Sequence, residues 1–170
     1  MLFTVWAPKA LSVSVVGEFN KYDGRVHLME RIEDTGVFEL FIPGLAAGCG
    51  YMYEIKRQGK GTTRKLDPVS RQISSVPITA SVVSDEIMPD SYAWNDGFWM
   101  IKRKKEAGKK KPVTVYEVSL TDWLKEKSAD ELVDFVKQEG YTHICFLPVA
   151  EYLNEEMNGY STLGYFAVTH

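Results

Sequence analysis

The chain has 170 residues, of which 45% are hydrophobic and 25% are charged, as in an ordinary globular protein. No apolar run approaches the roughly 20 residues of a membrane helix, and no signal-peptide pattern follows Met1, so we expect a cytoplasmic protein without a membrane partner. The net charge is −3, but seven of the 20 basic residues lie between Lys102 and Lys111. The rest of the chain is therefore acidic, which argues against a nucleic-acid partner.

Strand-length segments separated by glycine and proline turns fill the first part of the chain and predict an immunoglobulin-like β-sandwich. The expected strands are residues 2–6, 11–17, 26–31, 36–42, 50–57, 62–66 and 80–83, the first two within hairpin distance of each other. Alternation of apolar and polar residues predicts which side chains point into the core. In two of these strands they are Leu11, Val13, Val15, Phe38, Leu40 and Ile42.

The expected strand at residues 11–17 ends in a turn that carries two aromatic side chains, Phe19 and Tyr22. Its turn formers are Gly17, Asn20, Asp23 and Gly24. An aromatic ring displayed on a polar turn is a plausible platform for stacking on a sugar. The alternative is that Phe19 folds back over the end of the core and Tyr22 covers an edge.

Strand signals become sparse between residue 67 and residue 99. Trp94 and Trp99 flank a polar turn there. We expect these two side chains to pack a long connector between domains; the alternative is that they bind a sugar. The basic run at residues 102–111 has no interleaved aromatic residues, which is typical of a solvated linker. We therefore expect a sandwich at residues 1–100, a basic linker at 101–112 and a second domain at 113–170.

The pattern changes after Pro112 to that of an α/β protein. Residues 113–118 form an expected strand, and Ser128 with Glu131 forms a capping box that opens a helix closed by Gly140. The nearly continuous apolar run at residues 142–147 predicts a strand that is buried on both faces of a parallel sheet. This β-α-β unit fits the first unit of a TIM-type (β/α)8 barrel.

Several blocks of the sequence together resemble α-glucan branching enzymes. VWAPKALSVSVVGEFNKYDGR, GVFELFIPGL and GYMYEIKRQGKGTTRKLDP are similar to their N-terminal sandwich, the family-48 carbohydrate-binding module. VTVYEVSLTDWL, GYTHICFLPVAEY and GYSTLGYFAVTH are similar to the opening of their catalytic barrel, which belongs to glycoside hydrolase family 13 in the α-amylase superfamily. The likeness runs from end to end, with the blocks in matching order and spacing.

The resemblance implies weak binding of an α-glucan such as glycogen or starch. The candidate substrate-binding residues are Tyr22 and Asn20 in the turn, and Tyr160, which matches the tyrosine that stacks on the sugar at the cleavage point. Met52 stands where related modules use a lysine for glucan contact. Four further positions depart from the family pattern near the expected donor site: Ser119, Tyr152, Asn158 and Ser161.

No catalytic residue, metal or cofactor is expected in this chain. Glycosyl transfer with retention needs two carboxylates about 5 Å apart, and the resemblance implies that both lie on later barrel strands than this sequence reaches. We therefore assign no catalytic role to the three glutamates that follow the second expected strand, Glu151, Glu155 and Glu156. The histidines share no metal-ligand spacing; they are His27, His143 and His170.

The sequence thus predicts the N-terminal region of a 1,4-α-glucan branching enzyme that is inactive by itself. The alternative is a non-catalytic glucan-binding or scaffolding protein derived from the same family. The partial barrel would expose strand edges and apolar faces, so we expect a homodimer through residues 113–147, with docking onto the sandwich as the alternative.

Overall fold

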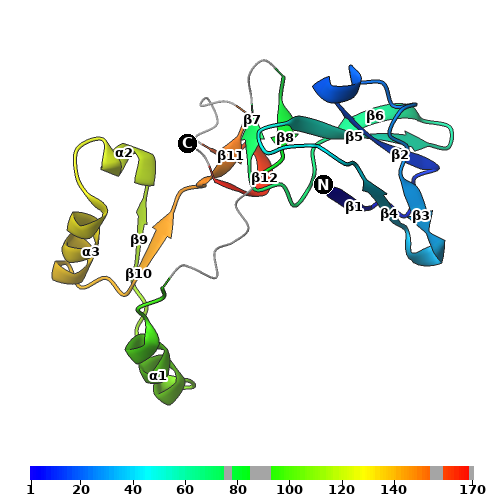
Figure 1. Ribbon diagram of the computed structural model, residues 1–170. Coiled ribbons are helices and arrows are strands. Elements are labelled where there is room, and N and C mark those ends of the chain that lie inside the picture. Colours follow the sequence, from blue (N-terminus) through cyan, green and yellow to red (C-terminus); the bar gives the residue numbers. More distant parts are fainter. Residues whose placement is uncertain (75–77, 85–92, 154–158, 169–170) are drawn as a thin grey trace. The chain divides into compact units, whose positions relative to one another are not determined.

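A computed structural model describes residues 1–74, 78–84, 93–153 and 159–168. The chain divides into two compact units, one formed by Met1–Asp85 with Val149–His170 and the other by Glu86–Pro148 (Figure 1). The first unit contains β1 (Leu2–Trp6), β2 (Ser12–Gly17), η1 (Glu18–Asn20), β3 (Glu30–Ile32), η2 (Glu33–Thr35), β4 (Val37–Phe41), β5 (Gly50–Arg57), β6 (Gly61–Lys65), β7 (Ile73–Ser74), β8 (Ala80–Val82), β11 (Ala150–Tyr152) and β12 (Thr162–Val168). The second contains α1 (Gly97–Glu106), β9 (Val115–Val118), α2 (Leu120–Leu124), α3 (Ala129–Gln138) and β10 (His143–Phe146).

The first unit holds the predicted β-sandwich. One sheet has the order β1-β4-β3, and the other has the order β2-β5-β8-β7 with β6 paired to β5. An apolar cluster of residues from both sheets joins their inner faces. Its members include Phe3, Val5, Val13, Val15, Phe38, Ile42, Tyr51 and Tyr53, and Leu40 packs against it half-buried.

Two features of the sandwich differ from the sequence-based expectation. β1 and β2 do not form a hairpin, since β1 pairs with β4 and β2 pairs with β5. Leu11 is 58% exposed because it precedes β2, and the next apolar positions of that strand fill the core instead.

The expected strand at residues 26–31 passes from one sheet to the other. The carbonyl of His27 accepts a 3.0 Å hydrogen bond from the amide of Val15 in β2, and the amide of Met29 donates a 2.9 Å bond to the carbonyl of Val13. The chain then enters β3, which pairs with β4 in the opposite sheet. Residues 27–32 thus connect the two sheets by main-chain hydrogen bonds.

The antiparallel pair β11 and β12 lies in the same compact unit as the sandwich. Gly164 of β12 packs so closely against Ile73 of β7 that a Cβ atom would collide with that side chain. β12 thus packs against the sheet that contains β7, within the same compact unit.

The second unit contains the expected β-α-β arrangement, with β9 and β10 parallel. Ser128 accepts from the amide of Glu131 at 3.2 Å, and the Glu131 carboxylate accepts from the amide of Ser128 at 2.7 Å, so the predicted capping box is present. Gly140 has a φ of +77° at the helix end. These local signals depend only on neighbouring residues, which is why the sequence reveals them.

Two expectations for the second unit are corrected. Residues 101–106 of the segment expected to be a linker belong to α1, because lysine and arginine favour helix formation. The strand expected to be buried on both faces is largely exposed, with Phe146 44% exposed, because β10 pairs only with β9 among the described residues. Among the described residues, no helix is long and apolar enough to cross a membrane.

Candidate functional site

The turn after β2 has an unusual backbone. β2 ends at Gly17, the 3-10 helix η1 follows, and Lys21 and Tyr22 then adopt φ angles of 54° and 57°. The left-handed region is unfavourable for residues with a Cβ atom and is most unusual for a bulky aromatic residue. Successive residues in this region therefore need support from the surrounding structure.

Asn20 provides part of that support from inside the turn, where it is buried. Its Oδ1 accepts a 3.0 Å hydrogen bond from the amide of Gly17, and its Nδ2 donates a 2.9 Å bond to the carbonyl of Val15. The same Nδ2 lies 2.9 Å from Nδ1 of His27. Because a side-chain amide nitrogen can only donate hydrogen bonds, Nδ1 of His27 is the acceptor in this bond. The Asn20 side chain thus fixes the path of the turn.

Phe19 packs as the core-covering interpretation predicts. Its ring is half-buried against the sandwich core and lies 5.4 Å from the His27 ring, centroid to centroid. Gly17 is in contact with this ring and with the carbonyl of Gly50, which leaves no space for a Cβ atom at position 17.

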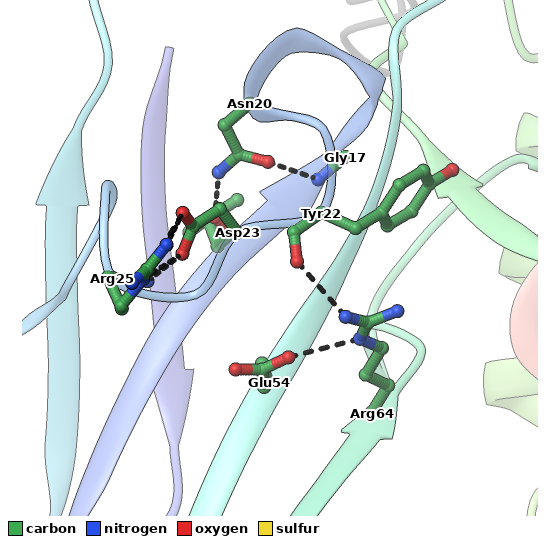
Figure 2. A network of polar contacts seen from close by, with 8 residues as sticks. Gly17, Asn20, Tyr22, Asp23, Arg25, Glu54 and Arg64 are labelled. Carbon is green, nitrogen blue, oxygen red and sulfur yellow. Dashed lines mark hydrogen bonds and ion pairs between the residues drawn. The ribbon is translucent and has the colours of Figure 1, made fainter.

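Tyr22 is held by its backbone and by one side of its ring. Its amide donates to the carbonyl of Gly17 at 2.9 Å, and its carbonyl accepts from Nη2 of Arg64 at 3.0 Å. The guanidinium carbon of the same arginine lies 5.5 Å from the centroid of the tyrosine ring (Figure 2). The ring remains half-exposed at the surface.

Arg64 is itself oriented by Glu54. The two residues are directly opposite each other in the antiparallel pair β5 and β6, and Nε of Arg64 donates to Oε2 of Glu54 at 3.1 Å. Gly24 lies against the Glu54 carboxylate, and a Cβ atom at Gly24 would overlap it. Figure 2 shows the contacts from Glu54 to Arg64 and from Arg64 to the carbonyl of Tyr22, which connect the sheet to the turn.

Asp23 and Arg25 form a second charged pair beside the turn. Nη2 of Arg25 lies 2.7 Å from Oδ2 of Asp23, and the amide of Arg25 donates to Oδ1 at 3.0 Å. These hydrogen bonds, first from the side chain and then from the backbone of Arg25, lower the pKa of Asp23 to about 2. The carboxylate is therefore ionised at neutral pH.

An apolar hollow of about 440 Å³ adjoins this site on the first unit. Arg64, which contacts Tyr22, lines this hollow. Met52, which stands where related modules have a lysine, lines it too. Other lining residues come from the segment after β6 and from β12, namely Leu66, Pro68, Leu163 and Tyr165.

Tyr160 lies on a different element, just before β12, and is 63% exposed. The neighbouring carbonyl of Ser161 accepts from the amide of Leu153 at 3.0 Å. Glu151 lies in β11, half-buried, whereas Asn158, Glu155 and Glu156 fall outside the described residues. Ser119 caps α2 by accepting from the amide of Asp122 at 3.2 Å.

The sequence-based reasoning missed Arg64 and Glu54 as parts of the site. One signal was available, because a hairpin whose turn is centred on Gly59 places residues 54 and 64 opposite each other, and their opposite charges favour a cross-strand pair. Among the described residues, no group of histidine, cysteine, aspartate and glutamate side chains could hold a metal ion.

Comparison with known proteins gives results for both parts of the chain. Residues 1–70 match the family model of carbohydrate-binding module 48, described as the isoamylase N-terminal domain. The chain is 42% identical, over 98% of its length, to a part of the 1,4-alpha-glucan branching enzyme GlgB of Gloeobacter violaceus, and 44% identical, over 99%, to that of Thiobacillus denitrificans. It spans 24% of the length of each of these relatives. The resemblance to branching enzymes is thus confirmed.

Solved structures of pullulanases share the fold. The pullulanase of Bacillus acidopullulyticus matches with a TM-score of 0.63 and 22% identity, over 98% of this chain and 24% of that one. A GBS pullulanase, SAP, in complex with maltotetraose, matches with a TM-score of 0.62 and 20% identity, over 99% of this chain and 27% of that one. At this identity the match supports the fold, including a sandwich followed by a partial α/β region.

Proposed function

We propose that residues 1–70 bind α-glucan chains weakly through the turn that carries Tyr22. The single observation that carries this proposal is the position of Tyr22, a half-exposed aromatic ring on a braced turn of a segment that matches a carbohydrate-binding module. Asn20 contributes by holding the turn, since its amide is engaged by Gly17 and Val15.

A single stacked ring with a few exposed hydrogen bonds limits the affinity. The apolar face of a glucose unit covers the open side of the Tyr22 ring, and solvent competes for every hydroxyl group. We therefore expect dissociation constants from high micromolar to millimolar, which correspond to a binding free energy of roughly 4 to 6 kcal/mol in magnitude. Such weak binding is useful when many chain ends are presented together, as on a branched polymer.

Titration of the isotope-labelled chain with maltoheptaose tests the proposal. Amide shifts should concentrate in the turn around Tyr22, and in Tyr22→Ala they should require a several-fold higher maltoheptaose concentration. Trp6→Ala is the matched control, because Trp6 is an exposed aromatic residue of the same unit that lies on β1, in the opposite sheet from β2. Shifts that persist unchanged in Tyr22→Ala would contradict a site at this residue.

We further propose that the chain is the N-terminal region of a 1,4-α-glucan branching enzyme and that it has no transferase activity alone. Support comes from the similarity to branching enzymes over nearly the whole chain, which spans only 24% of their length. Incubation with amylose should produce neither branches nor shorter chains, because uncatalysed glycoside cleavage is negligible. Activity that survives repurification, with a heat-inactivated control, would contradict this.

A non-catalytic glucan-binding or scaffolding protein is the second candidate. Ser119 favours it, because this residue departs from the family pattern and its side chain serves as a helix cap. Tyr160 is exposed and available for a sugar in either case. The reading frame of the gene beyond the codon for His170 distinguishes the two: a continuation into barrel segments with aspartate and glutamate favours the enzyme, and an immediate stop codon favours the scaffold. In both cases we place the protein in the cytoplasm and expect self-association through its second unit.

A further inference from the structure

We propose that Arg64 is a positioning residue for glucan recognition, and that it acts by fixing the ring of Tyr22. This inference rests on the proposed function, but it concerns a residue on another strand, 42 positions further along the chain. It follows from three observations: the strained backbone of the turn, the two contacts that Arg64 makes with Tyr22, and the orientation of Arg64 by Glu54.

The backbone at Tyr22 would not keep its conformation without restraints. Lys21 and Tyr22 both have left-handed φ angles, and neither is a residue type that favours them. The buried Asn20 restrains the beginning of the turn, and the bond from the Tyr22 amide to Gly17 closes it. The carbonyl on the far side of Tyr22 is restrained by Arg64. Removing Arg64 therefore frees the turn at the residue that bears the ring.

Arg64 also selects the orientation of the ring. Its guanidinium carbon lies 5.5 Å from the ring centroid, a distance at which a cation is attracted to an aromatic face. One side of the ring is thus engaged by the protein and the opposite side is left to a sugar. A ring that is ordered before the ligand arrives loses less conformational entropy on binding, so its affinity is higher.

The geometry requires arginine rather than any cation. Nε is directed to Oε2 of Glu54 while Nη2 is directed to the carbonyl of Tyr22, so the planar guanidinium contacts two partners at once. The Glu54 carboxylate reaches this position because Gly24 leaves room for it. A lysine ammonium at the end of a flexible stem retains the charge but not this fixed pair of directions.

The test compares maltoheptaose titrations of the wild-type chain, Arg64→Ala, Arg64→Lys and Arg57→Ala. Arg57 lies at the far end of the same hairpin, paired with Gly61, and is the matched control. We expect Arg64→Ala to weaken binding roughly five- to tenfold, as for the loss of one hydrogen bond and of preorganisation, with little rescue by lysine and no effect of Arg57→Ala. Thermal denaturation verifies that each variant is folded.

Two further measurements separate positioning from a direct sugar contact and from general stability. In the Tyr22→Ala background, Arg64→Ala should cause no additional loss of affinity, because its effect passes through the ring. Without ligand, the amide order parameters of the turn should fall in Arg64→Ala and not in Arg57→Ala. Equal affinities of wild type and Arg64→Ala, additive losses in the double variant, or an unchanged turn in Arg64→Ala would each overturn the inference. A wild-type chain that shows no shift at Tyr22 would instead overturn the proposed function.

Discussion

The phenol of Tyr51 donates a 2.7 Å hydrogen bond to the buried carboxylate of Asp67. The phenol of Tyr53 reaches the same oxygen at 3.2 Å, and the other carboxylate oxygen accepts from the amide of Val69 at 2.9 Å. The amide of Asp67 donates to Oγ of Ser81 at 2.9 Å. Asp67 therefore connects the segment after β6 to the inner face of the sheet.

Replacement of Asp67 by alanine should destabilise the sandwich strongly. Two buried phenols and one amide would lose their acceptor, and each buried group without a partner costs about 1 to 3 kcal/mol. We expect the free energy of unfolding to fall by about 3 kcal/mol or more, measured by urea denaturation. Asp34→Ala in the exposed η2 is the control and should change it by less than about 0.5 kcal/mol. Equal effects of both variants would contradict the structural role of Asp67.

The sandwich should lose stability at alkaline pH because of the same cluster. Burial, and then the charge of Asp67, raise the pKa of Tyr51 and of Tyr53 well above the ordinary value. Above about pH 10 the unfolded chain releases these protons, whereas the folded chain retains them. The contribution of the two tyrosines to the free energy of unfolding is therefore fully present below this pH and is lost as the pH rises. The loss is about 1.4 kcal/mol per pH unit for each tyrosine. Urea denaturation between pH 8 and 11 measures this, and Tyr51→Phe should show a smaller slope.

Asp23 should remain ionised in acid. The hydrogen bonds from Arg25 lower its folded-state pKa to about 2, so the stabilising contribution of this carboxylate is present above its unfolded pKa and is lost as the pH falls towards 2. Carbon-detected NMR of the side-chain carboxyl group measures this titration. Arg25→Ala should return the pKa of Asp23 towards the ordinary range, whereas a titration unaffected by that substitution would disprove the pairing in solution.

Gly17→Ala should destabilise the turn, although the φ of Gly17 is −173° and suits any residue. The added methyl group would meet the carbonyl of Gly50 and the ring of Phe19, so strand or ring must move. We expect a loss of about 1 to 3 kcal/mol in chemical denaturation. Gly97→Ala is the control, because open space surrounds Gly97 at the start of α1. Wild-type stability in Gly17→Ala would rule out this close packing.

The second unit should associate with a copy of itself. β9 and β10 form a two-stranded parallel sheet, and Val115 and Phe146 expose 52% and 44% of their surface. Because a pair of strands with one helix is marginal in water, association that buries these side chains is favourable. Light scattering across a concentration series should show a dimer or larger assembly, weakened in Phe146→Lys and unchanged in Leu28→Lys, a control on the sandwich surface. A monomer whose β10 amides exchange freely would instead indicate an unfolded fragment.

Sequence patterns predicted the elements of this fold better than their partners. The alternation of apolar and polar residues correctly predicted that Phe38 and Val13 belong to the core, because side chains on one face of a strand recur every two residues. The capping box at Ser128 was equally local. Strand pairing depends on distant residues, so the short spacing between β1 and β2 falsely indicated a hairpin.

The candidate site shows the same division. The turn formers predicted that Tyr22 would be displayed on a bend, and the structure adds that its backbone is left-handed. Asn20 was expected to contact substrate, and its amide braces the turn from within. The contact between Tyr22 and Arg64 joins two segments that are distant in the sequence, so only the folded chain reveals it.

The stretch from His27 to Ile32 gives the sandwich cooperativity. Its first half is hydrogen-bonded to β2 and its second half to β4, without an intervening loop. Separating the layers breaks the main-chain hydrogen bonds of this stretch with β2 or those with β4, so the loss of either layer weakens the anchoring of the other. The turn that carries Phe19 and Tyr22 begins at the end of β2 and ends where this stretch begins. Its conformation therefore depends on both layers of the sandwich.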